Sequence, residues 1–219
     1  MEQSANQVII LSGGEPLASD REIVLPRDAY IIAADSGLHH AVDLDIAVDL
    51  VIGDMDSVDP AALATAVSRG SRSETHPTDK DRTDLELAVD TALVSGARKL
   101  LIIGAHTGRL DHLLGAMGLF AATATNVDEI VWTDGLTEIY GCVPGHPTVI
   151  NGRIGDGVSL VPASMDVSGI NTEGLRWKLL DDGLRAGSTR GVSNVIDSTP
   201  ASVSVESGTL LIIHEWSRT

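Results

Sequence analysis

Short apolar runs alternate with segments of helical spacing through the first half of the chain. The apolar runs are bounded mostly by Gly or Asp, as short buried strands are, and they cover residues 8–11, 30–34, 50–52, 100–103 and 130–132. Helical spacing appears over residues 60–69, 84–94 and 111–124. Strands that alternate with helices predict an α/β fold with a mostly parallel sheet covered on both faces, which is a Rossmann-like three-layer domain.

The pattern changes after about Asp134, where helical periodicity disappears and Gly, Ser, Thr and Val dominate. Strand-like runs separated by turn residues cover 157–162, 175–179, 201–205 and 210–216. They predict a C-terminal all-β sandwich domain. The boundary is expected between Asp134 and His146, which gives an N-terminal domain over residues 1–138 and a second domain over residues 139–219.

Composition narrows the class of protein. Of the 219 residues 43% are hydrophobic but only 3% are aromatic, so the core is expected to be aliphatic. The formal net charge of −16 argues against a nucleic-acid partner and against docking on an anionic membrane. Cys142 is the only cysteine, no signal-peptide pattern is present, and no apolar run approaches the roughly 20 residues of a membrane span. These features predict a cytoplasmic protein.

Five aspartates fall in two short clusters, and they are the main candidates for chemistry. Asp54 and Asp56 follow the strand predicted at 50–52, at the edge of an α/β sheet where ligands bind. Asp79, Asp81 and Asp84 form the second cluster. Carboxylates this dense repel one another, so a hard divalent cation is the natural counter-charge if the clusters meet. The alternative is that the first pair only forms a turn.

The second cluster, T-D-K-D-R-T-D, also has an ordinary explanation. Asp81 or Thr83 as an N-cap, with Asp84 in the first turn, would be normal helix chemistry. Lys80 and Arg82 between the acids favour a site, because phosphates bound with Mg²⁺ need both signs of charge at close quarters.

Residues 104–112 form a third candidate segment, directly after the strand predicted at 100–103. Arg109 is a candidate phosphate ligand, and Asp111 is an N-cap, an acceptor for a substrate amine, or both. His106 and His112 lack zinc-ligand spacing, so a zinc site is rejected. The chain contains no Walker phosphate-binding loop, and the turn at Asp35-Ser36-Gly37 is only a weak nucleotide-loop signal.

Taken in order, these segments resemble the thiamine pyrophosphokinase family. Its four motifs appear here as Ala34-Asp35-Ser36-Gly37, Gly53-Asp54-Met55-Asp56-Ser57, Asp79-Lys80-Asp81-Arg82-Thr83-Asp84 and Thr107-Gly108-Arg109-Leu110-Asp111-His112. The C-terminal half is also similar, in residues 174–179, in the loop that contains Ser193 and Asn194, and in the apolar last strand. The sequence departs from the family pattern at Thr107 and at Val195-Ile196.

The resemblance implies transfer of a diphosphoryl group from ATP to the hydroxyl of thiamine, with Mg²⁺, in a homodimer whose active sites lie between subunits. Metal ligands are expected at Asp54, Asp56, Asp79 and Asp81, and Lys80 and Arg109 complete the expected catalytic group. The ATP side would include Asp35, Ser36, Gly37, Arg82, Thr83 and Asp84. The thiamine side would include Asp111, His112, Ser193 and Asn194, the last two from the partner subunit.

Two other functions stay open from the sequence. One is a pyrophosphokinase that acts on another alcohol, such as a hydroxymethylpterin, because the acidic motifs serve the ATP chemistry and bear little on the acceptor. The other is a non-catalytic sensor that binds thiamine or a nucleotide. Trp177 and Trp216 are possible stacking partners for a thiamine ring, but the alternation around Trp177 favours a core or interface residue.

Overall fold

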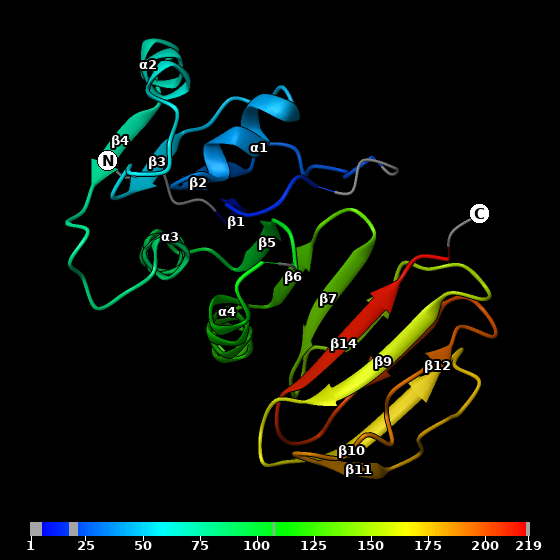
Figure 1. The fold of residues 1–219 in the computed structure, drawn as a ribbon. Coiled ribbons are helices and arrows are strands. Elements are labelled where there is room, and N and C mark those ends of the chain that lie inside the picture. Colours follow the sequence, from blue (N-terminus) through cyan, green and yellow to red (C-terminus); the bar gives the residue numbers. More distant parts are fainter. Residues whose placement is uncertain (1–5, 18–21, 107, 218–219) are drawn as a thin grey trace. The chain divides into compact units, whose positions relative to one another are not determined.

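The computed structural model describes residues 6–17, 22–106 and 108–217 (Figure 1). The chain divides into two compact units. Unit 1 comprises Met1–Leu119 and Trp132–Gly135, and unit 2 comprises Phe120–Val131 and Leu136–Thr219. The domain boundary near residue 138 stays a prediction.

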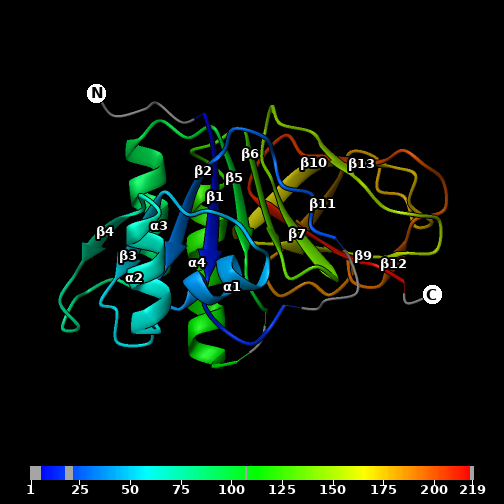
Figure 2. The same ribbon diagram turned by 90° about the horizontal axis from the view of Figure 1, so that it is seen from above.

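Unit 1 is built on a parallel sheet. Its strands lie in the order β5-β1-β2-β3-β4, which can be followed across Figure 2, and every neighbouring pair is parallel. Their bounds are β1 Gln7–Ser12, β2 Tyr30–Ala34, β3 Leu50–Gly53, β4 Arg72–Thr75 and β5 Lys99–Ile103. Of β6 (Glu129–Thr133), only Trp132 and Thr133 belong to this unit.

Helices cover both faces of this sheet. In Figure 1, α1 (Gly37–Asp43) and α2 (Pro60–Ser68) lie on one side of the strands, and α3 (Asp84–Val94) and α4 (Leu110–Thr123) lie on the other. The core under α1 and α2 is aliphatic and includes Ile9, Leu11, Ala33, Val51 and Ile103. The predicted three-layer α/β fold is therefore confirmed. Within the described residues, no helix is long and apolar enough to cross a membrane.

Unit 2 is an antiparallel sandwich. One layer has the order β12-β9-β14-β7 and the other has the order β11-β10-β13-β8. The bounds are β7 Thr137–Cys142, β8 Thr148–Ile150, β9 Gly157–Pro162, β10 Asp166–Glu173, β11 Asp182–Arg185, β12 Asn194–Val195, β13 Ala201–Ser204 and β14 Leu210–Glu215. Fully buried aliphatic side chains such as Ile170, Ile196 and Ile212 fill its core. The predicted all-β sandwich is confirmed.

Most elements predicted from the pattern are present, with ends shifted by one or two residues. The sequence did not indicate α1, β4 or the strands β7, β8, β10, β11 and β12 of unit 2. In β4 all four residues are exposed, so an edge strand of this kind leaves no apolar run to detect.

The strand predicted at 175–179 is wrong. Leu175 makes only an isolated bridge with Ile196, and no strand continues from it. The Asn194 side chain takes the backbone groups of Trp177 instead, since its Nδ2 donates to the Trp177 oxygen (2.7 Å) and its Oδ1 accepts from the Trp177 N–H (3.1 Å). Trp177 itself is 58% exposed and does not belong to the core of unit 2.

Candidate active site

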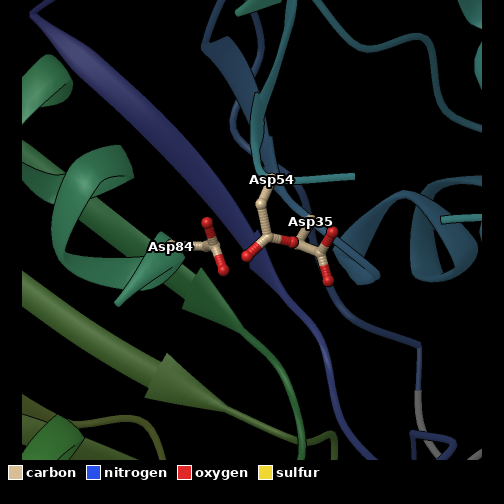
Figure 3. Close-up of side chains that lie close together, drawn as sticks. All are labelled: Asp35, Asp54 and Asp84. Atoms are coloured by element: carbon tan, nitrogen blue, oxygen red, sulfur yellow. The ribbon is translucent and has the colours of Figure 1, made fainter. Parts of the chain in front are cut away.

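Three carboxylates from separate segments meet at one edge of the parallel sheet in unit 1. Asp35 follows β2, Asp54 follows β3, and Asp84 is the first residue of α3. One oxygen from each lies within 4.8 Å of the others, and Figure 3 shows the three carboxyl groups next to one another. The carboxyl ends of parallel strands share one edge, which explains how residues up to 49 positions apart come together. We call these three residues the acidic group.

Gly53 makes the close approach of these side chains possible. Its φ of +151° lies in a region that other residues rarely adopt, and a Cβ placed there would lie 2.9 Å from Asp84 Oδ1 and 3.0 Å from Asp35 Cβ. Asp35 also has a positive φ, +46°, in the left-handed region that Asp and Asn tolerate better than most residues. The backbone here is shaped to bring carboxylates together.

Asp35 is the most buried member of the acidic group. It is 8% exposed, and its Oδ1 has no hydrogen-bond partner among the described residues. Burial raises the pKa of Asp35, and the neighbouring Asp84, Asp54 and Asp56 carboxylates raise it further, against a hydrogen bond from the Ser36 backbone. A buried carboxylate oxygen without a donor is well suited to a cation.

Lys80 supplies the positive charge that contacts the acidic group. Its Nζ lies 2.7 Å from Asp54 Oδ2 and 3.2 Å from Asp84 Oδ1, and its side chain is only 14% exposed. Burial lowers the pKa of Lys80, but hydrogen bonds to Asp54 and Asp84 outweigh it and leave that pKa raised. The Lys80 hydrogen bond is in turn the main reason why the pKa of Asp54 is lowered.

The structure groups a different set of carboxylates from the set expected to bind metal. Asp54 belongs to both sets, whereas Asp56, Asp79 and Asp81 are exposed and lie outside the acidic group. Lys80, which lies between Asp79 and Asp81 in the sequence, is the residue of this segment that contacts Asp54. Metal binding by Asp54, Asp56, Asp79 and Asp81 together stays a prediction.

The acidic group fits a hard divalent cation by its donor chemistry. It offers carboxylate oxygens from three different segments, and two of these oxygens, Asp35 Oδ1 and Asp84 Oδ1, are buried and accept no hydrogen bond from the described residues, although Asp84 Oδ1 lies 3.2 Å from Lys80 Nζ. Such oxygen ligands suit Mg²⁺, which is usually held by a few carboxylates together with substrate phosphates. Asp35 and Asp84, expected on the ATP side, are thus the structure's own partners for Asp54.

A cavity of about 620 Å³ opens beside the acidic group. It is lined by most of the residues expected to contact ATP, and by Lys80, Arg109 and His112. The predicted site residues among its lining are Asp35, Ser36, Asp56, Lys80, Arg82, Thr83, Asp84, Arg109 and His112. A concave site with both signs of charge can hold a phosphorylated substrate.

Local contacts fix the segment before α3. Thr83 is the N-cap of this helix, because its Oγ1 accepts a hydrogen bond from the Glu86 N–H (3.2 Å). Arg82 pairs with Asp90 on the same helix (2.9 Å). Thr83, one of the two expected caps, is confirmed, and the cap places Asp84 in the first turn of α3.

Arg109 and Asp111, expected to bind different substrates, pair with each other at the start of α4. Arg109 donates to both Asp111 oxygens, at 2.6 and 3.2 Å, and both side chains are mostly exposed. The Arg109 guanidinium lowers the pKa of Asp111 to about 2. Since α4 begins at Leu110, Asp111 lies inside the helix and is not its N-cap. Thr107 lies outside the described residues.

The remaining predicted residues lie elsewhere. Gly37 is the first residue of α1, where a Cβ would lie 2.0 Å from the Leu11 oxygen. Ser193 and Asn194 belong to unit 2. Ser193 is exposed with a φ of +65°, whereas Asn194 is buried and its amide holds the backbone of Trp177.

Sequence reasoning did not identify Trp132 as part of the cavity. Its ring lies 5.0 Å from the His106 ring, its Nε1 donates to the Gly104 oxygen (2.9 Å), and it lines the cavity wall. His106 Nδ1 in turn lies 3.3 Å from Asp134 Oδ2. Trp132 lies near the carboxyl end of β6, and Asp35 and Asp54 directly follow the ends of their strands. This position is the sequence signal that could have identified Trp132.

An α/β unit with acidic residues and a cavity of about 620 Å³ at the sheet edge, followed by a β sandwich, is typical of a two-domain nucleotide-dependent transferase. The family model "Thiamin pyrophosphokinase, catalytic domain" matches residues 22–131. The model "Thiamin pyrophosphokinase, vitamin B1 binding domain" matches residues 148–210. The chain belongs to the thiamine pyrophosphokinase family.

Relatives of known structure agree with this assignment. The thiamine pyrophosphokinase of Bacillus subtilis is 26% identical over 206 residues, which is 94% of this chain and 96% of that protein. Its crystal structure superimposes with a TM-score of 0.84 and covers 97% of this chain and all of that chain (100%). The thiamin pyrophosphokinase of Geobacillus thermodenitrificans is also 26% identical, with a TM-score of 0.79 over 97% of this chain and 99% of that chain.

Proposed function

We propose that this protein transfers the diphosphoryl group of ATP to the hydroxyl of thiamine, giving thiamine diphosphate and AMP. The observation that carries the proposal is the acidic group with Lys80 beside one cavity, in a chain whose two halves match the catalytic and vitamin B1 binding domains of one family.

Asp35, Asp54 and Asp84 would hold Mg²⁺ beside the cavity, with Asp56 at the cavity wall as a further candidate. When bound, the ion would neutralise charge on the ATP phosphates as the alcohol oxygen attacks the β-phosphorus and AMP leaves. The buried Oδ1 of Asp35 supports this role most directly, because no donor among the described residues satisfies it.

Cationic side chains around the same cavity would orient the triphosphate. Lys80, Arg82 and Arg109 all line it, and a guanidinium can bind phosphate oxygens in a bidentate way. Arg109 is paired with Asp111 through Nε and Nη2, which leaves its Nη1 available for a phosphate oxygen.

On the acceptor side, we propose that Asp111 receives the aminopyrimidine of thiamine and that His112, Ser193 and Asn194 contribute to the same site. The last two would come from the partner subunit of a homodimer. The Asn194 amide already holds the loop of Trp177, so its contribution would be to shape that loop. The N-terminal domain, residues 1–138, would bind ATP and supply Asp111 and His112 to the thiamine site. Residues 139–219 would supply the rest of the thiamine site, and the protein would act in the cytoplasm.

A coupled assay of AMP release tests the proposal. With ATP, Mg²⁺ and thiamine, AMP should form in step with thiamine diphosphate, and excess EDTA should stop it. A hydroxymethylpterin in place of thiamine should give no AMP above the background without acceptor. Tight thiamine binding with no AMP release under any condition would show a binding protein instead.

A further inference from the structure

Lys80 is the one cationic side chain, among the described residues, that forms ion pairs with the acidic group. Its ammonium touches Asp54 Oδ2 and Asp84 Oδ1, which are members of the group expected to bind a divalent cation. Asp35, the third member, has an oxygen with no hydrogen-bond donor and is 8% exposed. The ammonium therefore meets two of the three carboxylates and leaves the most buried one unsatisfied.

The charge balance indicates that the Lys80 ammonium replaces only part of the charge that a divalent cation would supply. Three carboxylates with one ammonium leave an excess of two negative charges, whereas a divalent ion alone would leave one. An ammonium and a divalent ion that share the same carboxylate oxygens also repel each other at contact distance. The ammonium and the divalent ion therefore cannot both keep close contacts with the same carboxylate oxygens.

The chemistry of lysine suits a displaceable ion. Its ammonium is a compact point charge on a flexible stem of four carbons, unlike the rigid planar fork of arginine. Lys80 also precedes the N-cap of α3 by three residues, in a segment without regular structure. The side chain lines the cavity, so a short rotation of the stem leaves it among the groups expected to meet phosphates.

We propose that Lys80 is the resident counter-cation of the acidic group, and that its ammonium is displaced towards the cavity when a divalent cation binds. The inference rests on the proposed function, because it uses the same acidic group. It goes beyond that function by assigning Lys80 two positions, one on the carboxylates without metal and one beside the phosphates with it.

Binding of Mn²⁺ to the nucleotide-free protein tests this directly, measured from the free Mn²⁺ signal by electron paramagnetic resonance. The variant is Lys80→Gln, and the matched control is Arg82→Gln, which removes the same charge two residues away but pairs with Asp90 instead of the acidic group. Lys80→Gln should bind Mn²⁺ about tenfold more tightly than the unchanged protein, a coupling within the usual range. Arg82→Gln should change the affinity less than threefold.

Melting temperature in EDTA gives a second readout that is independent of catalysis. Without metal, Lys80→Gln should melt lower than the unchanged protein, because the carboxylates lose their counter-charge. Saturating Mn²⁺ should raise its melting temperature by more than it raises that of the unchanged protein. If the ion pair persisted when metal is bound, Lys80→Gln would instead lower the melting temperature equally with and without Mn²⁺.

The inference is overturned if Lys80→Gln binds Mn²⁺ no more tightly than the unchanged protein, or if Arg82→Gln tightens Mn²⁺ binding as much as Lys80→Gln does. It is also overturned if neither the unchanged protein nor Lys80→Gln binds Mn²⁺. Failure of the proposed function shows separately, as the absence of thiamine-dependent AMP release by the unchanged protein. If the unchanged protein releases AMP but Lys80→Gln shows no gain in Mn²⁺ affinity, the proposed role of Lys80 is rejected and the proposed function is not.

Discussion

Asp35 combines two properties that usually oppose each other, burial and charge. Its left-handed backbone conformation restricts which residues can replace it, and its raised pKa reflects the cost of holding an ionised carboxylate away from water. Residues that carry such a cost are commonly found at functional sites. The ionised Asp35 carboxylate therefore lowers the stability of the fold, and a bound cation would offset this cost.

Asp35→Asn should separate these two effects. Asn tolerates the same positive φ, and the substitution removes one buried charge, so the melting temperature in EDTA should stay the same or rise. Thiamine-dependent AMP release should fall at least 100-fold, about 3 kcal/mol of transition-state stabilisation. Thermal melting and the AMP assay measure the two quantities.

Asp45→Asn is the matched control, because Asp45 has a similar φ of +51° but is exposed and lies outside the acidic group. It should change neither the melting temperature nor the activity by a measurable amount. A fully active Asp35→Asn variant would contradict the role of Asp35 in cation binding.

At the scale of elements, the N-termini of two helices in unit 1 perform different tasks. Asp59 caps α2, where its Oδ1 accepts from the Ala61 N–H (3.0 Å). Thr83 caps α3, and its capped first turn carries Asp84 into the acidic group. Both caps stabilise helices, but only the second also positions a site residue.

Thr83→Ala and Asp59→Ala should therefore differ in function and not in stability. Each should cost about 1 kcal/mol of unfolding free energy, or roughly 2–4 °C in melting temperature for a chain of this size. Only Thr83→Ala should also weaken Mn²⁺ binding and lower the rate of AMP release. Thr83→Ser keeps the hydroxyl and should restore both, and equal losses of activity from the two alanine variants would contradict the assignment.

At the scale of the whole molecule, a buried polar cluster in unit 2 makes the stability depend on pH. Asp156 and His214 are fully buried and lie 3.0 Å apart, and Asp156 also accepts hydrogen bonds from the Arg153 and Ser217 N–H groups. Burial alone would raise the pKa of Asp156, but the backbone donors and His214 lower it to about 2. This cluster links β14 to the loop before β9.

A depressed carboxylate pKa stabilises the fold above its unfolded value, near 4, and the stabilisation disappears as the pH falls through about 2. Asp156 should contribute about 2 kcal/mol at pH 7. The free energy of unfolding in urea should therefore fall between pH 7 and pH 2, and it should fall less in Asp156→Asn. This variant should also be less stable than the unchanged protein at pH 7.

Asp182→Asn provides the control for this pH dependence. The pKa of Asp182 is also lowered, by Arg190, but this ion pair is partly exposed to solvent. Its loss should leave the unfolding free energy nearly unchanged at every pH. An acid limb that stays the same in Asp156→Asn would show that other carboxylates control it.

The acidic site illustrates how far the sequence could be followed. The predicted motifs lie at the carboxyl edge of the sheet or at the start of α3 as expected, because strand ends and caps are local properties. The choice among five aspartates was not local. In the segment Asp79-Lys80-Asp81 the sequence alone does not say whether the acids or the lysine contact the rest of the site, and the structure shows that it is Lys80.

The sequence by itself determined the two-part fold, the aliphatic core and the family, since hydrophobic periodicity and ordered motifs survive without coordinates. Only the tertiary structure decided that Asp35, Asp54 and Asp84 converge and that Lys80 pairs with two of them, Asp54 and Asp84. The physical reason is that convergence depends on which strands are neighbours and on the φ of residues such as Gly53, which set distances between segments far apart in the chain. Periodicity records which face a residue occupies within its own element, and carries no information on the distance to another.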